Sequence, residues 1–350
     1  MSTDQRPTPY LRVDVDRLRA NVARAAGAAV AGGVALRPHA KTHKSADIAR
    51  LQLEAGAVGL TVATVGEAEA FAAEGVVDLF VAYPLWLTTE LAGRLRSVAS
   101  SGVRLAIGVD SVDGARTAAA LLAGSAVEVL VEVDCGHHRS GVDPASAGQV
   151  ALAAAELPVR GVYTFPGHSY SPDARAVAAR DEGVALAAAR ASVTAAGREI
   201  HVVSGGSTPS LGHADTSVLT EVRPGVYVFG DAQQWELGST TPDQVALTAV
   251  ATVVSHAGGR AVLDAGSKVL GADRASYASG SGRLLEHPEA RIVQLSEHHA
   301  VVELPGRLPR LGSRVLVVPN HCCSAVNLAD ELWPTTGGGP WPVTARGRNG

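Results

Sequence analysis

The stretch Leu36-Arg37-Pro38-His39-Ala40-Lys41-Thr42-His43-Lys44 follows a short apolar run, residues 34–36, and precedes a segment with helical periodicity, residues 45–54. It therefore places a lysine at the turn between a predicted strand and a predicted helix. In a parallel (β/α)8 barrel, such turns carry the active-site residues. The stretch predicts that fold, with Lys41 on the edge of the barrel where chemistry takes place.

Lys41 is flanked by His39 and His43, so three nitrogen-bearing side chains are expected to crowd one turn. Neighbouring positive charge and partial burial both lower the pKa of a lysine. A lysine with a lowered pKa is suited to forming a Schiff base with an aldehyde. The alternative is a solvated basic turn in which Thr42 caps the helix, and the stretch alone does not decide between them.

The chain beyond this stretch alternates between two kinds of segment. Strand-like runs occupy residues 34–37, 59–63, 79–83, 104–109, 127–133, 160–165, 200–204 and 222–229. Helical periodicity is found in residues 46–54, 66–74, 88–100, 112–122, 145–155 and 174–196. Eight strands alternating with helices predict a (β/α)8 TIM barrel of the α/β class. A doubly wound sheet is the second choice, but no GxGxxG motif follows the first strand.

The two ends of the chain have a different pattern. Residues 9–15 are predicted to be extended and residues 16–31 helical. After Trp235, short β-like runs separated by Gly, Pro and Asp predict a mostly antiparallel β domain. These runs are residues 245–255, 260–264, 292–296, 300–304 and 314–319. We therefore expect a barrel over residues 12–238 and a β domain over residues 239–350 together with 1–11. The Gly-rich tail from Pro334 is expected to be partly disordered or an edge strand.

Composition narrows the class of protein. The chain has 350 residues, a formal charge of −4 and a hydrophobic fraction of 46%, which suffices for a large core. A charge so close to neutral gives no electrostatic case for binding nucleic acid. Three cysteines argue for a reducing compartment and against a disulfide scaffold. With neither a signal-peptide pattern nor an apolar run of about 20 residues, the expected location is cytoplasmic.

Two candidate ligand-binding stretches follow the fifth and sixth predicted strands. Arg139 lies beside a Gly-flanked turn, although it could simply pair with Asp134 or Asp143. In the stretch TFPGHSY, residues 164–170, the ring of His168 could stack on an aromatic ligand and Tyr170 could hydrogen-bond that ligand. A histidine in such a loop is also often satisfied without any ligand.

Two more candidate ligand-binding stretches lie at the seventh and eighth predicted strands. Gly206, Ser207 and Thr208 belong to a glycine-rich turn whose backbone N–H groups suit a phosphate. In barrels, the loops after strands seven and eight often hold phosphate, although a plain Gly-Ser turn is the alternative. Arg223 is expected to point toward the barrel mouth or to pair with Glu221.

The stretch Asn320-His321-Cys322-Cys323 follows an apolar strand of the β domain. If the chain stays extended there, His321 and Cys323 project to the same side and Cys322 to the other. An imidazole and a thiolate suit Zn²⁺, with positions left for water or substrate. The alternative is a buried histidine beside two inert cysteines.

Taken together, the motifs RPHAKTHKS, GHHRSG, TFPGHSY, SGGSTPS, EVRPGVYVFGD, DAGSK and NHCCSAVNL occur in this order between Pro9 and about Asn327. The chain resembles the D-serine dehydratase-like and D-threonine aldolase family. Its members are pyridoxal-phosphate enzymes with an alanine-racemase-type barrel and a C-terminal β domain. The resemblance implies a homodimer in which the partner's β domain completes each active site.

The resemblance also implies roles for individual residues. Lys41 matches the Schiff-base lysine. The other matched residues are Arg139 at the cofactor's phenolic oxygen, His168 on its ring face, Gly206, Ser207 and Thr208 at its phosphate, Arg223 at its pyridine nitrogen, Tyr170 and Tyr227 as further candidates, and His321 and Cys323 as the metal pair. Two departures are visible. Residues 296–300 are SEHHA where the family often has SEEHG, and Cys322 leaves open which sulfur binds the metal.

The His-x-Cys pair favours one branch of the family, the zinc-dependent dehydratases. We therefore expect a lyase that uses pyridoxal 5'-phosphate and Zn²⁺, or another divalent metal such as Mn²⁺, to eliminate water and ammonia from a D-β-hydroxy-amino acid. D-serine, D-threonine and D-threo-3-hydroxyaspartate are the candidate substrates. The alternatives are a metal-dependent D-threonine aldolase, a racemase that uses Tyr277 as a second base, and a pyridoxal-phosphate carrier.

Overall fold

The computed structural model describes residues 6–350. By its internal contacts the chain divides into two compact units, which are described separately. The barrel unit comprises Ala25–Lys41, Ala49–Gly225 and Gly347–Gly350. The β unit comprises the described residues up to Arg24, together with Thr42–Ile48 and Val226–Arg346.

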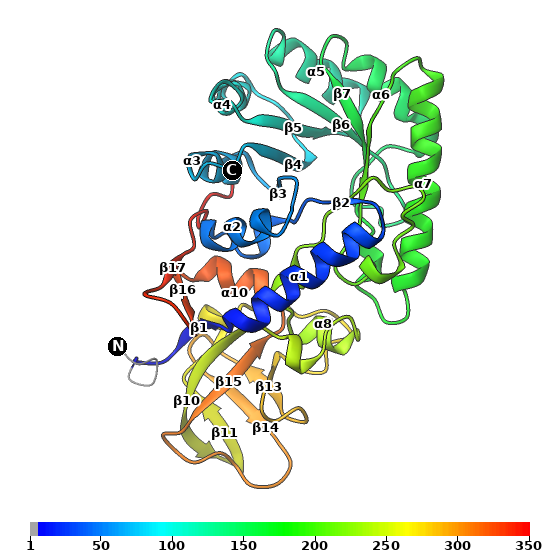
Figure 1. Cartoon of the computed structure of the whole chain (residues 1–350). Helices are drawn as coiled ribbons and strands as arrows, with labels where there is room; N and C mark the ends of the chain where they lie inside the picture. The colour runs from blue at the N-terminus through cyan, green and yellow to red at the C-terminus, as the bar shows by residue number, and fades with distance from the viewer. Residues whose placement is uncertain (1–5) are drawn as a thin grey trace. The chain divides into compact units, whose positions relative to one another are not determined.

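The barrel unit is built on eight parallel strands in the order β2-β9-β8-β7-β6-β5-β4-β3 (Figure 1). These are β2 (Ala35–Leu36), β3 (Leu60–Val62), β4 (Asp78–Pro84), β5 (Arg104–Val109), β6 (Glu128–Glu132), β7 (Val159–Tyr163), β8 (Val202–Gly205) and β9 (Glu221–Val222). The chain beside β2 also meets β3, since Val58 N donates to Leu36 O and Thr61 N donates to Pro38 O. This curled sheet confirms the predicted barrel and rules out the doubly wound alternative.

Helices follow the strands at the predicted places. In chain order they are α1 (Val15–Ala31), α2 (Ala46–Glu54), α3 (Val65–Ala73), α4 (Thr89–Ser100), α5 (Val112–Leu122), α6 (Ala147–Ala153) and α7 (Arg175–Ala195). Thr64, Thr88 and Ser111 cap α3, α4 and α5, each accepting a hydrogen bond from a backbone N–H of the first turn. These caps explain why the helices begin where they do.

The eighth predicted strand was too long. Residues 222–229 were expected to be extended, but β9 ends at Val222 and a 3-10 helix, η6 (Val226–Val228), follows it. Pro224 lacks an N–H and has a fixed φ, so it cannot continue the ladder of a central strand. The chain therefore turns directly after Arg223.

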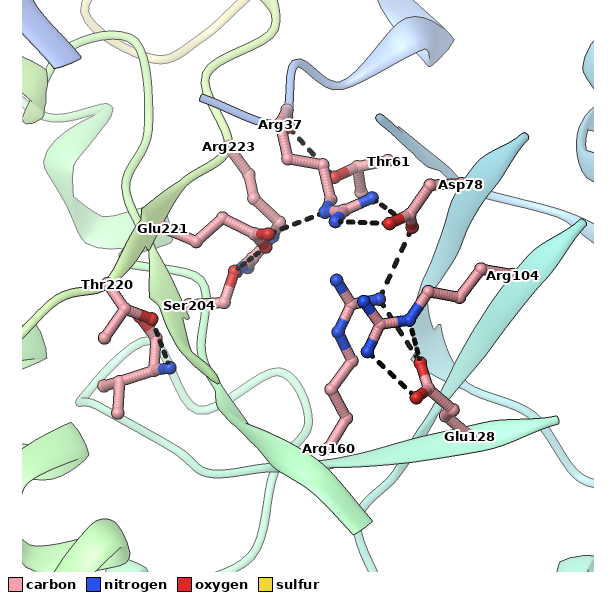
Figure 2. A network of polar contacts seen from close by, with 11 residues as sticks. Arg37, Thr61, Asp78, Arg104, Glu128, Arg160, Ser204, Thr220, Glu221 and Arg223 are labelled. Atoms are coloured by element: carbon pink, nitrogen blue, oxygen red, sulfur yellow. Dashed lines mark hydrogen bonds and ion pairs between the residues drawn. The ribbon is translucent and has the colours of Figure 1, made fainter. Parts of the chain in front are cut away.

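A network of charged side chains fills the end of the barrel where its strands begin (Figure 2). Asp78, Arg104 and Glu128 stand at the first positions of β4, β5 and β6. Arg37, only 1% exposed, donates to Asp78 and to Glu221 at 2.7 Å each. A buried cation with two carboxylate partners is satisfied, so this end has a structural role and leaves the opposite end for chemistry.

The β unit contains one sheet in the order β13-β14-β11-β10-β1-β16-β17, with β15 pairing with β10 and β12 (Figure 1). The strands are β1 (Tyr10–Val13), β10 (Leu247–Ala257), β11 (Arg260–Leu263), β12 (Gly282–Leu284), β13 (Arg291–Leu295), β14 (Ala300–Glu303), β15 (Arg314–Pro319), β16 (Glu331–Pro334) and β17 (Trp341–Pro342). All their pairings are antiparallel except β1 with β16, as the sequence predicts for a mostly antiparallel domain.

Short helices complete the description. The β unit has α8 (Ala232–Glu236), α9 (Ser267–Leu270) and α10 (Cys322–Leu328). The 3-10 turns besides η6 are η2 (Ala40–Thr42), η3 (Pro144–Ser146), η4 (Gly167–Ser169), η5 (Leu211–His213) and η7 (Pro242–Gln244). Between residues 6 and 350, no helix is long and apolar enough to cross a membrane.

The stretch 320–323 does not stay extended, so the condition set for placing His321 and Cys323 on one side of a strand is not met. The strand β15 ends at Pro319, and His321 is the N-cap residue of α10. Ala325 N donates to His321 O, and Cys322 N donates to the buried Asp231 at 3.2 Å. These contacts satisfy the first backbone groups of a helix, so the spacing of the His-x-Cys pair is set by a helix start.

Candidate active site

Phe165 lies at the centre of the candidate residues in the barrel unit. The Lys41 Nζ atom is 5.9 Å from the centroid of the Phe165 ring, and the Arg139 guanidinium is 4.9 Å from it. The ring of Tyr170 is 6.1 Å away, tilted by 43°. Lys41, Arg139 and Tyr170, from three different loops, therefore converge on one aromatic ring that sequence reasoning quoted but did not single out.

The loop of Lys41 is held at its base. His39 N donates to Pro224 O at 3.0 Å, which ties the residues after β2 to those after β9. Lys41 then lies on η2, half-buried. In the β unit, His43 is fully buried and its Nδ1 accepts from Ser45 N at 3.1 Å, next to the start of α2. His43 thus has a local structural contact besides any influence on the lysine.

Arg139 does not pair with Asp134. Asp134 accepts from the backbone N–H groups of Gly136 and His138, and its Oδ2 lies 2.5 Å from His138 Nδ1. The suggested pairing of Arg139 with Asp134 is therefore not what the loop shows. Arg139 is exposed and packs over Phe165, with its charge available to a ligand.

His168 lies on η4 with one ring nitrogen engaged. Its Nε2 is 3.3 Å from Asp181 Oδ2 on α7, while its Nδ1 is buried without a hydrogen-bond partner in the described chain. An unsatisfied buried nitrogen costs free energy unless something binds it. The side chain is half-buried, so one part of it can still meet a ligand.

The glycine-rich turn after β8 carries a cluster of buried hydroxyls. Ser207 Oγ lies 2.8 Å from Ser169 Oγ and 2.7 Å from Ser210 Oγ. Gly206 has φ +84°, a conformation that favours glycine. Its N–H is already donated to Glu182 Oε1 at 2.6 Å, and Ser207 N is donated to Ser210 Oγ. The hydroxyls, more than these two N–H groups, are the donors the turn offers to a phosphate.

No motif in the sequence indicated a role for Glu182. It lies in the middle of α7, fully buried, and its Oε2 has no hydrogen-bond partner among residues 6–350. Burial raises its pKa to about 7, although the N–H of Gly206 opposes this shift. The carboxyl beneath the turn is therefore easily protonated, which removes a negative charge from beside a candidate anion site.

Arg223 is buried beneath the same region of the barrel. It donates to Ser204 Oγ at 2.6 Å (Figure 2). It also donates to the carbonyl of Thr164 at 2.6 Å. Its guanidinium stands 5.3 Å from the centroid of Tyr163. The expected pairing with Glu221 runs through the hydroxyl of Ser204, which donates to Glu221. Burial lowers the pKa of Arg223, and the neighbouring carboxylates counteract it.

Two tyrosines complete the set of residues. Tyr227 lies on η6 and is half-buried in the β unit. Tyr277, also in the β unit, has a buried hydroxyl without a partner in the part of the chain described, and burial raises its pKa to about 12. A tyrosine with so high a pKa is a poor base at neutral pH.

The candidate metal residues lie together at the start of α10. His321 Nδ1 is 2.9 Å from Asp273 Oδ2, and Cys323 Sγ is 3.3 Å from Thr42 Oγ1. Thr42 is the residue directly after Lys41 in the chain. Among the residues described, no group of three or more His, Cys, Asp or Glu side chains is arranged to hold a metal ion.

The pKa values of the two neighbouring cysteines are shifted in opposite directions. Hydrogen bonding from Cys322, then the charge of His321 and the hydroxyl of Thr42, hold the pKa of Cys323 well below its usual range. Burial raises the pKa of Cys322 well above it. The charge of Cys323 in turn raises the pKa of His321 to about 10. Because a thiolate is the form that binds metals, the pair fits a divalent cation through Cys323.

Comparison with known proteins agrees with this arrangement. Residues 13–233 match the family model "Alanine racemase, N-terminal domain", and residues 246–334 match "Putative serine dehydratase domain". The chain is 34% identical over 349 residues to a D-threo-3-hydroxyaspartate dehydratase from Delftia, covering 91% of each chain. It is 30% identical over 370 residues to a 3-hydroxy-D-aspartate aldolase from Paracoccus denitrificans, covering 99% of this chain and 94% of the other.

Solved structures show the same similarity. The Delftia dehydratase superposes with a TM-score of 0.89 at 32% identity over 97% of both chains. A D-threonine aldolase from Filomicrobium marinum superposes with a TM-score of 0.85 at 31% identity, over 97% of this chain and 96% of the other. Two further similar structures are alanine variants of a D-threo-3-hydroxyaspartate dehydratase, at a histidine and at a cysteine separated by one residue, and the cysteine variant was solved in the metal-free form. The chain belongs to the family of the alanine racemase N-terminal domain, here followed by a serine dehydratase-type domain.

Proposed function

We propose that this protein is a pyridoxal-phosphate-dependent lyase that eliminates water and ammonia from a D-β-hydroxy-amino acid, with a divalent metal, to give a 2-oxo acid. The observation that carries the proposal is the pair His321 and Cys323 at the start of α10, in the same chain as Lys41 and its aromatic cluster. The similarity to a dehydratase over nearly the whole chain supports it.

Residues of the barrel unit would hold the cofactor. Lys41 would bind its aldehyde, and His168 its ring face. Other cofactor contacts would come from Arg139, Tyr170, Gly206, Ser207, Thr208, Arg223 and Tyr227. The buried hydroxyls around Ser207 and the unpaired Nδ1 of His168 fit such a ligand. Bound there, the cofactor supplies an electron sink that no side chain provides.

Lys41 has a second task in this proposal. As a neutral amine, its Nζ would take the proton from Cα of the substrate as general base. Arg223, a donor without acceptor capacity, would leave an adjacent ring nitrogen unprotonated.

His321 and Cys323 would hold the metal. Zinc or manganese at this pair supplies Lewis acidity at the β-hydroxyl of the substrate, which makes that hydroxyl a better leaving group. Two protein ligands leave the remaining positions of a tetrahedral site to water or substrate, as in catalytic rather than structural zinc sites.

Product analysis tests the function. Purified protein with pyridoxal phosphate and zinc is incubated with D-serine, D-threonine and D-threo-3-hydroxyaspartate, before and after chelation. A 2-oxo acid and ammonia, lost on chelation and restored by zinc, are the expected products. The substrate that turns over fastest identifies which of the three the pocket accepts. No turnover of any of them with both cofactors present would refute the proposal.

The second candidate is a retro-aldol lyase, because two of the similar proteins are aldolases of D-threonine and 3-hydroxy-D-aspartate. Cofactor and metal would be the same, and the broken bond would be Cα–Cβ. Glycine and an aldehyde in the assay above would assign this activity. A racemase is disfavoured because Tyr277, the base it would use, has a raised pKa.

Three further properties remain proposals. We propose domain boundaries of 12–238 and 239–350 with 1–11, and a homodimer, which light scattering on the purified protein would test. We also propose a cytoplasmic location. The three cysteines Cys135, Cys322 and Cys323 are all free, as is usual in a reducing compartment.

A further inference from the structure

Asp273 contacts the histidine of the proposed metal pair from a distant part of the chain. It lies in the loop after α9 and places its Oδ2 2.9 Å from His321 Nδ1. A carboxylate has no proton to give, so in this contact Nδ1 carries the proton and donates it. In the neutral ring, which is the form that binds a metal, the lone pair then belongs to Nε2.

Asp273 is itself held in place. Ser324 Oγ, on the first turn of α10, donates to the same Oδ2 at 2.7 Å. Histidine, aspartate and serine therefore form one hydrogen-bonded chain beside Cys323. Each member has a defined partner, so the hydrogen bond at Nδ1 fixes the orientation of the imidazole.

The backbone allows this approach at one position. Gly271 follows α9 with φ +76°, and a Cβ there would lie 2.9 Å from Ser324 Cβ. A residue with a side chain would be strained in that conformation and would push α10 away. The glycine thus lets the loop bearing Asp273 reach the helix that begins at Cys322.

We infer that Asp273 is a positioning residue for the metal site, which holds His321 in the tautomer and ring orientation in which Nε2 is the ligand. The inference rests on the proposed role of His321 and Cys323. Histidines that bind metals generally donate their other N–H to a carboxylate or carbonyl. Loss of such a partner typically weakens metal binding about 10- to 100-fold.

The same contact contributes little to folding. The side chain of Asp273 is 55% exposed and that of His321 is 36% exposed, so water screens their interaction. If this were only a weak surface contact, replacing Asp273 would therefore change neither the melting temperature nor the metal affinity. A positioning role predicts a selective loss of metal affinity at unchanged melting temperature.

The experiment measures zinc affinity without turnover. The full chain loaded with pyridoxal phosphate is stripped of metal and titrated with zinc against a chromophoric chelator. Asp273→Ala is expected to raise the zinc Kd about 10- to 100-fold. Asp273→Asn keeps an acceptor oxygen without the charge and is expected to recover part of the affinity. Ser324→Ala is expected to have a smaller effect than Asp273→Ala.

Two reference variants are needed to interpret the zinc titration. Asp330→Ala removes another exposed aspartate of the β unit, which pairs with Arg346, and is expected to leave the zinc Kd unchanged. His321→Ala is expected to lose more affinity than any Asp273 variant. If His321→Ala loses zinc but Asp273→Ala binds it as the unmodified protein does, the positioning role is refuted and the metal pair stands.

The remaining outcomes also count against the inference in distinct ways. If Asp273→Ala loses as much affinity as His321→Ala, Asp273 is a ligand and not a positioning residue. If His321→Ala retains full affinity, the metal pair itself is wrong. In that case the proposed function loses its metal, while product analysis still reports on the lyase chemistry.

Discussion

The Nη1 atom of Arg223 donates a hydrogen bond of 2.6 Å to Oγ of Ser204. The hydroxyl of Ser204 in turn donates to Glu221 Oε1 at 2.6 Å, and the other oxygen of Glu221 accepts from Arg37 (Figure 2). The guanidinium is thus separated from the nearest carboxylate by a single hydroxyl. Glu221 is already neutralised by Arg37, so the position of Arg223 depends on Ser204 more than on a direct ion pair.

Replacing Ser204 by alanine tests this dependence. The change leaves a buried N–H of Arg223 without its acceptor, which costs about 1–3 kcal/mol of unfolding free energy. If Arg223 faces the cofactor ring, the absorption maximum of the bound cofactor will also shift. Denaturant unfolding and the absorption spectrum measure the two effects.

The matched control is Thr220→Val. Thr220 directly precedes β9, and its hydroxyl exchanges hydrogen bonds with the backbone of Val203 in β8. The Thr220→Val change is expected to lower the unfolding free energy and to leave the absorption spectrum of the cofactor unchanged. Equal spectra for Ser204→Ala and the unmodified protein would place Arg223 away from the ring.

Lys41→Ala is expected to abolish the absorption band of lysine-linked cofactor and to lower turnover by at least about 100-fold, because one amine both binds the aldehyde and moves the Cα proton. Lys268→Ala removes a surface lysine whose side chain is 57% exposed and should change neither property. A lysine-linked band that survives in Lys41→Ala would assign the aldehyde to another lysine.

The two adjacent cysteines give a clear prediction about the metal ligand. Cys323→Ala should weaken zinc binding by more than about 100-fold, beyond the loss of an outer partner, because the low pKa of Cys323 makes it the thiolate. Cys322→Ala, at a fully buried position with a raised pKa, should cost stability and keep the metal. Metal analysis and thermal unfolding of both variants check this. The opposite pattern would make Cys322 the ligand.

Glu182 predicts a dependence of stability on pH. Burial raises its pKa from 4.5 to about 7, so in this interval the native state keeps a proton that the unfolded state has released. Its contribution to stability therefore falls as pH rises from about 4.5 to 7, by up to about 3 kcal/mol. Glu182→Gln mimics the protonated form. Its unfolding free energy should exceed that of the unmodified protein by a margin that grows from pH 5 to pH 8. Denaturant unfolding of both proteins at pH 5 and at pH 8 measures this margin. An equal margin at the two pH values would show that Glu182 does not titrate in this range.

Local sequence predicted the regular elements well. The periodicity of residues 112–122 and 46–54 gave the bounds of α5 and α2, because an amphipathic face and a capping residue are both local signals. It failed at the eighth strand, where the effect of Pro224 was underestimated. It gave no indication of the helix that begins at Cys322, where a buried acceptor, Asp231, accepts from the first backbone N–H of α10.

The residues of the candidate site likewise fall into two groups: those that a local motif indicates and those that no motif indicates. Lys41, His168 and Cys323 lie in short motifs that the sequence displays. Glu182 and Asp273 do not, because the groups they contact lie 24 and 48 residues away along the chain. Phe165 stood in a quoted motif, but its central place follows from three loops that converge on it.

The sequence by itself determined the class of fold, the lysine at the end of the first barrel strand, and the His-x-Cys spacing, since these depend on neighbours within a few residues. Only the tertiary structure decided which groups support them: Ser204 for Arg223, Asp273 for His321, and Thr42 for Cys323. The physical reason is that hydrogen bonds and burial act over a few ångströms, and folding alone determines which distant residues come that close.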